Sequence, residues 1–183
     1  MKVLVVYASR YGATQRIAER IADLLRQQGL EVPVQQADSA DRAEGYDAVV
    51  IGSAAYYFRW MKEAKAYVQR NRNALFGRPV WLFSSGPLGN ARTDPQGRDV
   101  REATIPMEIG EILETVHPVE HHVFFGALDY GKLGFFHRLL TKMPFNKGGA
   151  LFPQGDFRDW AEIEGWATSI GRTLTSLHTD ALQ

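Results

Sequence analysis

The residues whose types and spacing best suit chemistry form a short loop, Ser9–Thr14 (SRYGAT), near the start of the chain. An apolar run precedes this loop and a helical pattern follows it, so the loop joins a strand end to a helix start. The first turn of a helix presents unpaired N–H groups and a partial positive charge, which suit an anion. Gly12 lets the backbone come close, and Ser9 and Thr14 can donate hydroxyl hydrogen bonds.

The residues of the same loop argue against two common types of nucleotide-binding site. The loop has neither the lysine of a nucleoside triphosphate loop nor the three spaced glycines of a dinucleotide fingerprint. We therefore expect it to bind a single terminal phosphate. The alternative is a tight turn in which Thr14 caps the helix.

Two further loops follow later predicted strands. Gly52–Trp60 begins with small residues and continues into dense aromatics, so a flat ring could approach backbone amides and stack on a side chain. Alternatively, these aromatics cap the open edge of the core. Ser84–Asn90 has two glycines and a proline, and its backbone could hydrogen-bond the edge of a heterocycle or form an ordinary loop.

One phosphate site, one aromatic wall and one backbone wall together predict a pocket for flavin mononucleotide (FMN). We predict no catalytic side chain, because the flavin would be the reacting centre. The predicted cofactor-binding residues are Ser9, Arg10, Tyr11, Gly12, Ala13, Thr14, Ala54, Ala55, Tyr56, Tyr57, Ser85, Gly86, Pro87, Leu88, Gly89 and Asn90.

A basic, amphipathic stretch, Asp129–Ala150, is the fourth candidate. Four basic residues stand against the single acid Asp129, and apolar residues recur on one helical face. Such a helix could lie on an anionic membrane surface, lie beside a quinone, or bind the propionates of a porphyrin. It could equally pack its apolar face on the domain. The substrate or membrane candidates are Tyr130, Lys132, His137, Arg138 and Lys142.

Composition narrows the remaining classes of function. Lysine plus arginine and aspartate plus glutamate both number 21, so the net charge is zero. We therefore expect neither a nucleic-acid surface nor the acidic surface of a soluble electron carrier. The chain has no cysteine, which excludes disulfides and thiolate metal sites. The adjacent His121 and His122 would point to opposite faces of a strand, so no metal site is predicted.

No long uncharged apolar run is present, and the first residues resemble a strand rather than a signal peptide. We therefore expect a cytoplasmic protein, with a peripheral contact on the inner face of the membrane as a further possibility.

Strands and helices alternate along the 183 residues, which predicts a single α/β domain with a doubly wound, five-stranded parallel sheet and helices on both faces. In such sheets, ligands bind outside the carboxyl ends of the strands, where the three loops lie. The expected strands are Lys2–Tyr7, Glu31–Gln36, Asp47–Ile51 (closed by Gly52), Pro79–Ser84 and Val119–Phe125. The expected helices are one that ends at Gly29, then Trp60–Arg72, Val100–Val116 and Asp159–Leu174, the last with a capping box of Asp159 and Glu162.

The loop SRYGAT resembles the phosphate loop of flavodoxins, a hydroxyl residue, a glycine and a threonine at this spacing. Within that superfamily, the chain is most similar to the menaquinone-dependent protoporphyrinogen oxidase family. The supporting stretches are YDAVVIGSAAYY, GALDYGKLGFFHRLLTKM and DFRDWAEIEGWA.

The resemblance implies a flavodoxin-like domain over residues 1–183 with an insertion at about 129–150, and FMN as the cofactor. It also implies an oxidoreductase that passes electrons through the flavin to a quinone, with a tetrapyrrole as substrate. The alternatives are a long-chain-flavodoxin-type electron carrier, an NAD(P)H-dependent quinone reductase and a flavin-binding regulatory module.

Overall fold

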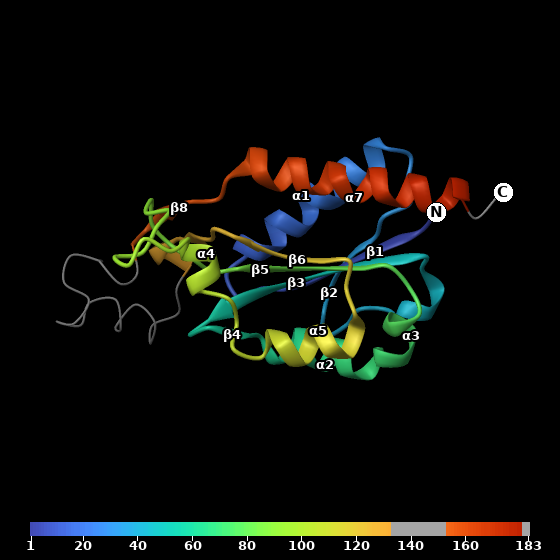
Figure 1. The fold of residues 1–183 in the computed structure, drawn as a ribbon, viewed down its shortest axis with the longest axis horizontal. Coiled ribbons are helices and arrows are strands. Elements are labelled where there is room, and N and C mark those ends of the chain that lie inside the picture. The colour runs from blue at the N-terminus through green and yellow to red at the C-terminus, as the bar shows by residue number, and fades with distance from the viewer. Residues whose placement is uncertain (133–152, 181–183) are drawn as a thin grey trace.

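A twisted parallel sheet forms the centre of the molecule in the computed structural model, which describes residues 1–132 and 153–180 (Figure 1). Its five parallel strands have the order β2-β1-β3-β5-β6, which confirms the predicted fold class. These strands are β1 (Val3–Ala8), β2 (Val34–Gln36), β3 (Ala48–Tyr56), β5 (Val80–Ser85) and β6 (Glu120–Phe124).

Helices cover both faces of this sheet (Figure 1). One face packs against α1 (Ala13–Gln27) and α7 (Trp160–Asp180), and the other against α2 (Lys62–Arg70), α3 (Arg72–Phe76) and α5 (Ile109–Val116). The apolar stripe of α1 is fully buried because its members recur at helical spacing. Two hydrophobic cores result, one on each face of the strands. Short 3-10 turns occur at η1 (Ala43–Gly45) and η2 (Tyr130–Lys132).

The prediction that Gly52 ends the third strand was wrong. β3 continues through Gly52 to Tyr56, and Gly52 lies opposite Tyr7 on β1 and Phe83 on β5. A Cβ atom at Gly52 would lie 1.9 Å from the ring of Phe83. The glycine therefore makes room for a neighbouring ring inside the sheet and does not mark a turn.

Two predicted helices also differ from the structure. Trp60 lies in β4 (Arg59–Trp60), which pairs antiparallel with β3, so the helix begins only at Lys62 and divides into α2 and α3. The predicted helix Val100–Val116 is divided into α4 (Val100–Ala103) and α5. Pro106 lies between these two helices, because proline lacks an N–H and restricts the residue before it.

A small antiparallel pair of strands, β7 (Ala127–Leu128) and β8 (Gly155–Asp156), lies beyond β6, at the carboxyl edge of the sheet (Figure 1). It is anchored by the Phe157 N–H, which donates to the Gly126 carbonyl at 3.1 Å. The chain then enters α7, where Asp159 accepts from the N–H of Glu162 at 3.1 Å. This contact confirms half of the predicted capping box. The Glu162 carboxylate instead contacts Arg101 and His122.

Within residues 1–132 and 153–180, the structure contains no helix that combines the length and the apolar character needed to cross a membrane.

Candidate cofactor site

The loop Ser9–Thr14 forms an open cradle at the start of α1. Gly12 is the N-cap residue and has a φ of 85°, a left-handed conformation that favours glycine. Its N–H donates to the Ser9 hydroxyl oxygen at 3.0 Å, which leaves the hydroxyl hydrogen of Ser9 able to donate elsewhere. The first-turn N–H groups after Gly12 have no carbonyl one turn back, so they can bind an anion.

Thr14 is buried within this cradle. The residue is 1% exposed, and its hydroxyl lies 2.8 Å from that of Ser85 at the end of β5. The hydroxyl therefore joins the first loop to the third. Its predicted donation to a ligand stays a prediction, because either oxygen of this pair could be the donor. The alternative prediction, that Thr14 caps the helix, was wrong, because Gly12 occupies that position.

The second and third loops approach each other closely at the sheet edge. Ala54 pairs with Ser85 across β3 and β5. A Cβ atom at Gly86 would lie 3.2 Å from both the Cβ and the carbonyl oxygen of Ala55, so a glycine fits this approach best. These contacts bring the predicted residues of both loops to the same edge of the sheet.

Aromatic residues gather between the first and second loops. The rings of Tyr11 and Tyr56 meet edge to face with centroids 6.1 Å apart, and the Arg10 guanidinium lies 5.7 Å from the centroid of Tyr56. Burial raises the pKa of the Tyr56 phenol to about 12, so this hydroxyl stays protonated at neutral pH. The three side chains form a wall beside the open cradle.

Tyr57 and Phe58 form the tip of the β3–β4 hairpin. Their φ angles are 50° and 60°, and the two residues are 69% and 52% exposed. Two-residue hairpin loops with positive φ at both positions usually contain asparagine and glycine, because other side chains are strained there. The segment before α5 holds this strained conformation, because the Met107 N–H donates to the Phe58 carbonyl at 2.9 Å.

The third loop uses part of its backbone internally. The Gly86 N–H donates to the Phe124 carbonyl at 3.3 Å, and the Pro87 carbonyl accepts from the Gly126 N–H at 2.8 Å. Gly89 has a φ of 99°, and Asn90 is exposed at the end of the loop. Leu88 is half-buried beside them. The groups tied to Phe124 and Gly126 hold the loop against the end of β6.

A buried chain of hydrogen bonds joins the second and third loops to β6. The indole N–H of Trp60 donates to the Ser84 hydroxyl at 2.7 Å, and the same oxygen lies 2.9 Å from Nε2 of His121. Burial lowers the pKa of His121 to about 4, so the ring is neutral and can accept from Ser84. The chain links β4, β5 and β6, and no pattern in the sequence predicts it.

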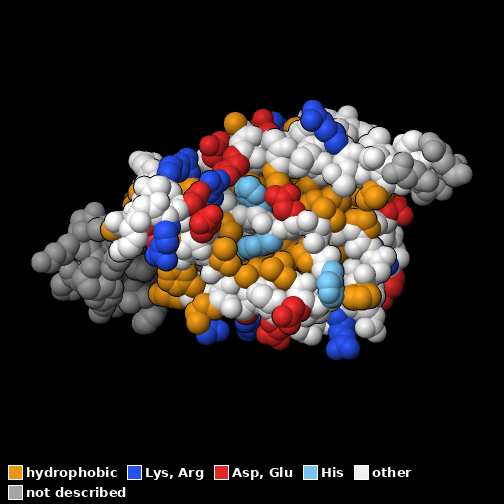
Figure 2. Space-filling model, in the orientation of Figure 1, with side chains coloured by type: hydrophobic (Ala, Val, Ile, Leu, Met, Phe, Trp, Pro, Cys, Tyr) orange, Lys and Arg blue, Asp and Glu red, His pale blue; other side chains and the backbone are white. Residues whose placement is uncertain are grey.

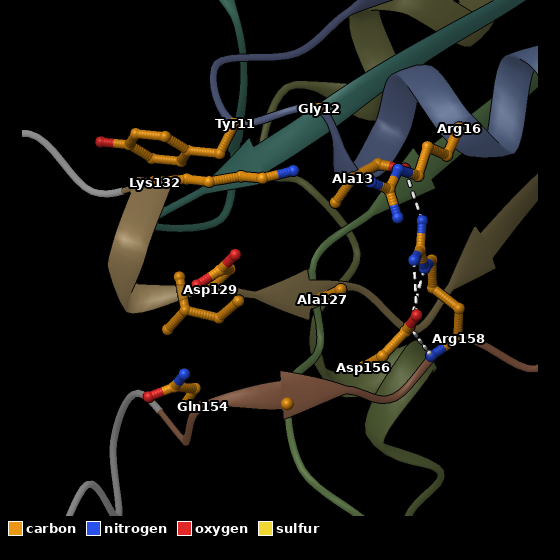
Figure 3. A pocket seen from close by; sticks show the side chains of 12 residues that line it. Tyr11, Gly12, Ala13, Arg16, Ala127, Asp129, Lys132, Gln154, Asp156 and Arg158 are labelled. Carbon is orange, nitrogen blue, oxygen red and sulfur yellow. Dashed lines mark hydrogen bonds and ion pairs between the residues drawn. The ribbon is translucent and has the colours of Figure 1, made fainter.

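A pocket of about 450 Å³ opens beside the first loop and extends to the β7–β8 strand pair (Figure 3). Tyr11, Gly12 and Ala13 form one side. Both signs of charge line the remainder, with three basic residues and two acidic ones. These charged residues are Arg16, Lys132, Arg158, Asp129 and Asp156.

Lys132, a predicted substrate or membrane residue, thus lines the pocket, and Tyr130 lies two positions earlier in η2. The other three candidates, His137, Arg138 and Lys142, lie outside the described residues. Sequence reasoning missed Arg16 and Arg158. Arg16 follows the loop by two positions and could have been found from that spacing, whereas nothing local indicates that Arg158 returns to this loop.

Comparison with known proteins agrees with this architecture. A model of the flavodoxin domain matches residues 4–150, and the chain belongs to this family. Protoporphyrinogen IX dehydrogenase (quinone) from Escherichia coli is 23% identical over 178 residues, which cover 93% of this chain and 94% of that protein.

Solved structures show the same fold. A flavodoxin from Pseudomonas aeruginosa has a TM-score of 0.59 at 15% identity, covering 96% of this chain and 99% of the other. A flavodiiron core from Synechocystis sp. has a TM-score of 0.62 at 13% identity, covering 97% of this chain and 36% of the other. Membership of this family makes FMN the cofactor of this chain and indicates a redox function.

Proposed function

We propose that this protein is an FMN-dependent oxidoreductase that passes electrons from a porphyrinogen-type substrate through the flavin to a quinone. The observation that supports this most is the match to the dehydrogenase from Escherichia coli, whose name states both the porphyrinogen and the quinone. The match covers nearly the whole of both chains. It therefore runs across the basic 129–150 segment as well as the flavodoxin core.

In this proposal, the cradle of Ser9–Thr14 holds the FMN phosphate. Its donors suit that group: first-turn N–H groups, the free hydrogen of the Ser9 hydroxyl, and the nearby cation Arg16. The stretches Ala54–Tyr57 and Ser85–Asn90 would flank the ring. Thr14 would contribute its N–H, and its buried hydroxyl would tie the cradle to Ser85.

FMN supplies the redox chemistry, and the protein places it and tunes its electronics. Each oxidation step removes two electrons and two protons from the substrate, and the quinone takes up the same number to become a quinol. Tyr56 and Tyr57 would exclude water from one side of the ring site. Lys132, together with Arg138 and Lys142 of the 129–150 segment, would pair with the carboxylates of a tetrapyrrole.

The balance of charge argues against a simple electron carrier that docks on basic partners. Acidic and basic residues are equal in number. Figure 2 shows both signs interspersed over the face it presents, without a continuous acidic area. Such a surface gives little long-range steering toward a basic redox protein.

Anaerobic assays with the FMN-loaded protein test the proposal. We expect porphyrinogen to be oxidised in step with quinone reduction, and each reagent alone to give no turnover. Boiled protein and free FMN at the same concentration serve as controls. Rapid quinone reduction by NADH or NADPH without porphyrinogen would instead identify a nicotinamide-dependent quinone reductase. Reduction of the flavin without turnover of either substrate would identify a carrier.

A further inference from the structure

A buried cation joins the phosphate cradle to the far end of the chain. The side chain of Arg158 is only 3% exposed and lies between Ala13 and Asp156 (Figure 3). Its Nη1 donates to the Ala13 carbonyl at 3.2 Å, although 145 positions separate the two residues. Its Nε donates to Oδ1 of Asp156 at 2.7 Å, and Nη2 donates to Oδ2 of the same carboxylate.

This arrangement fixes the guanidinium from three directions. Asp156 accepts the two parallel bonds of the fork, a geometry that only arginine provides. The guanidinium also lies 4.5 Å from the ring centroid of Trp160, at the start of α7. The hydrogen bond from Arg158 lowers the pKa of the Asp156 carboxyl, so this carboxylate stays ionised at neutral pH. A planar group held in this way has little freedom to rotate.

The carbonyl that Arg158 contacts belongs to the first residue of α1. Ala13 directly follows Gly12, the N-cap residue, so a shift of Ala13 would move the N–H groups of the cradle. Gly12 itself has open space around its missing Cβ and little intrinsic stiffness. The cradle therefore depends on neighbouring contacts to keep its N–H groups pointing at one place.

We infer that Arg158 is a positioning residue for the phosphate cradle, and that it sets the preference of this chain for FMN over riboflavin, which lacks the phosphate. It acts through Ala13, because one donor on each of its three nitrogens is directed to Ala13 or Asp156, which holds the guanidinium against the start of α1. The preference would hold whichever substrate reduces the flavin.

Two explanations predict different effects of a lysine at this position. If Arg158 acted only as a positive charge near the phosphate, Arg158→Lys would retain the preference. If it acts by positioning, Arg158→Lys loses the fork and the bond to Ala13, and it behaves like Arg158→Gln. Asp156→Asn removes the negative charge that holds the guanidinium and leaves Arg158 present. It should therefore raise the dissociation constant of FMN by a smaller factor than the Arg158 variants do.

The experiment measures the dissociation constants of FMN and riboflavin for the full chain by flavin fluorescence. In Arg158→Gln and Arg158→Lys, we expect the FMN constant to rise about tenfold or more and the riboflavin constant to change less than about twofold. Arg20→Gln is the matched control. Arg20 also joins α1 to the last helix, through Glu164 at 2.7 Å, and it lies further along α1 from the cradle.

Amide hydrogen exchange of the FMN-free chain gives a second readout that needs no flavin. We expect faster exchange at residues 11–15 in the Arg158 variants and unchanged exchange in Arg20→Gln. Equal loss of FMN and riboflavin binding, or retention of FMN affinity in Arg158→Lys, would overturn the positioning role. Unchanged exchange at the cradle would overturn it as well.

Discussion

The hydroxyl oxygens of Thr14 and Ser85 lie 2.8 Å apart, although 71 positions separate the two residues in the chain. Both side chains are almost fully buried, and each can satisfy the other. Thr14 lies in the first turn of α1, and Ser85 is the last residue of β5. The contact therefore fixes the first loop relative to the third.

Loss of either hydroxyl leaves the other buried without this partner. We expect Thr14→Val and Ser85→Ala each to lower the free energy of unfolding by about 1–3 kcal/mol. The double variant should lose less than the sum, because it buries no unpaired hydroxyl. Urea unfolding of the four proteins without FMN measures this coupling.

The same variants distinguish a structural hydroxyl from a phosphate ligand. We expect Thr14→Val to change the affinities for FMN and riboflavin by similar factors. A selective loss of FMN affinity, with no loss of stability, would show that the hydroxyl turns toward the phosphate when FMN binds.

Stability should fall in mild acid because of His121. Burial lowers its pKa to about 4 in the folded protein, whereas an exposed histidine titrates near about 6.5. The unfolded chain therefore binds the proton at a higher pH than the folded one. The contribution of His121 to the free energy of unfolding is complete above about pH 6.5 and is lost as the pH falls toward about 4. Between about pH 7 and about pH 5, the expected loss is about 2 kcal/mol.

His121→Gln should remove this dependence, because glutamine does not titrate and can still accept from Ser84. Urea unfolding near pH 7 and near pH 5 measures the difference. His117→Asn is the control, since His117 is exposed at the end of α5. The explanation fails if parent and His121→Gln lose the same free energy over this range.

The basic 129–150 segment should matter for turnover and leave flavin retention unchanged. Arg138→Gln combined with Lys142→Gln removes two charges that could pair with tetrapyrrole carboxylates or anionic lipids. We expect bound FMN to stay constant, while porphyrinogen oxidation or binding to anionic liposomes decreases. The difference from the parent should shrink at high salt, where charge attraction is screened. Parent-like turnover and liposome binding together would assign the segment to packing.

The sequence predicted the order of the central elements because apolar runs and helical spacing are local signals. It predicted the wrong end for β3, because Gly52 resembles a turn signal until Phe83 of the neighbouring strand is placed over it. The hydrogen-bond partners of Thr14 and Arg158 could not be predicted either, because each partner is far from its residue in the sequence. The hairpin at Tyr57 was missed for a different reason: its tip lacks the asparagine and glycine by which such turns are recognised.

The tip of the β3–β4 hairpin lacks the residues that this type of turn prefers. Tyr57 and Phe58 both have positive φ angles, a conformation that is strained by roughly 1–2 kcal/mol per residue. Tyr57→Asn combined with Phe58→Gly gives the pair that this turn prefers. We expect the double variant to be more stable by about 1–2 kcal/mol in all, with a melting temperature higher by roughly 2–8 °C.

The expected rise is opposite in sign to what most substitutions do, which makes it a sharp test. Val119→Thr is the control, because Val119 is an exposed apolar residue outside the left-handed region and its replacement relieves no strain. Thermal unfolding without FMN measures the change in stability, and flavin titration of the same proteins measures the change in affinity. If the tip contacts the flavin ring, the stabilised variant loses affinity for FMN and for riboflavin by the same factor, because the ring is common to both. A variant that is less stable than the parent would show that Tyr57 and Phe58 make packing contacts that outweigh the strain of their backbone.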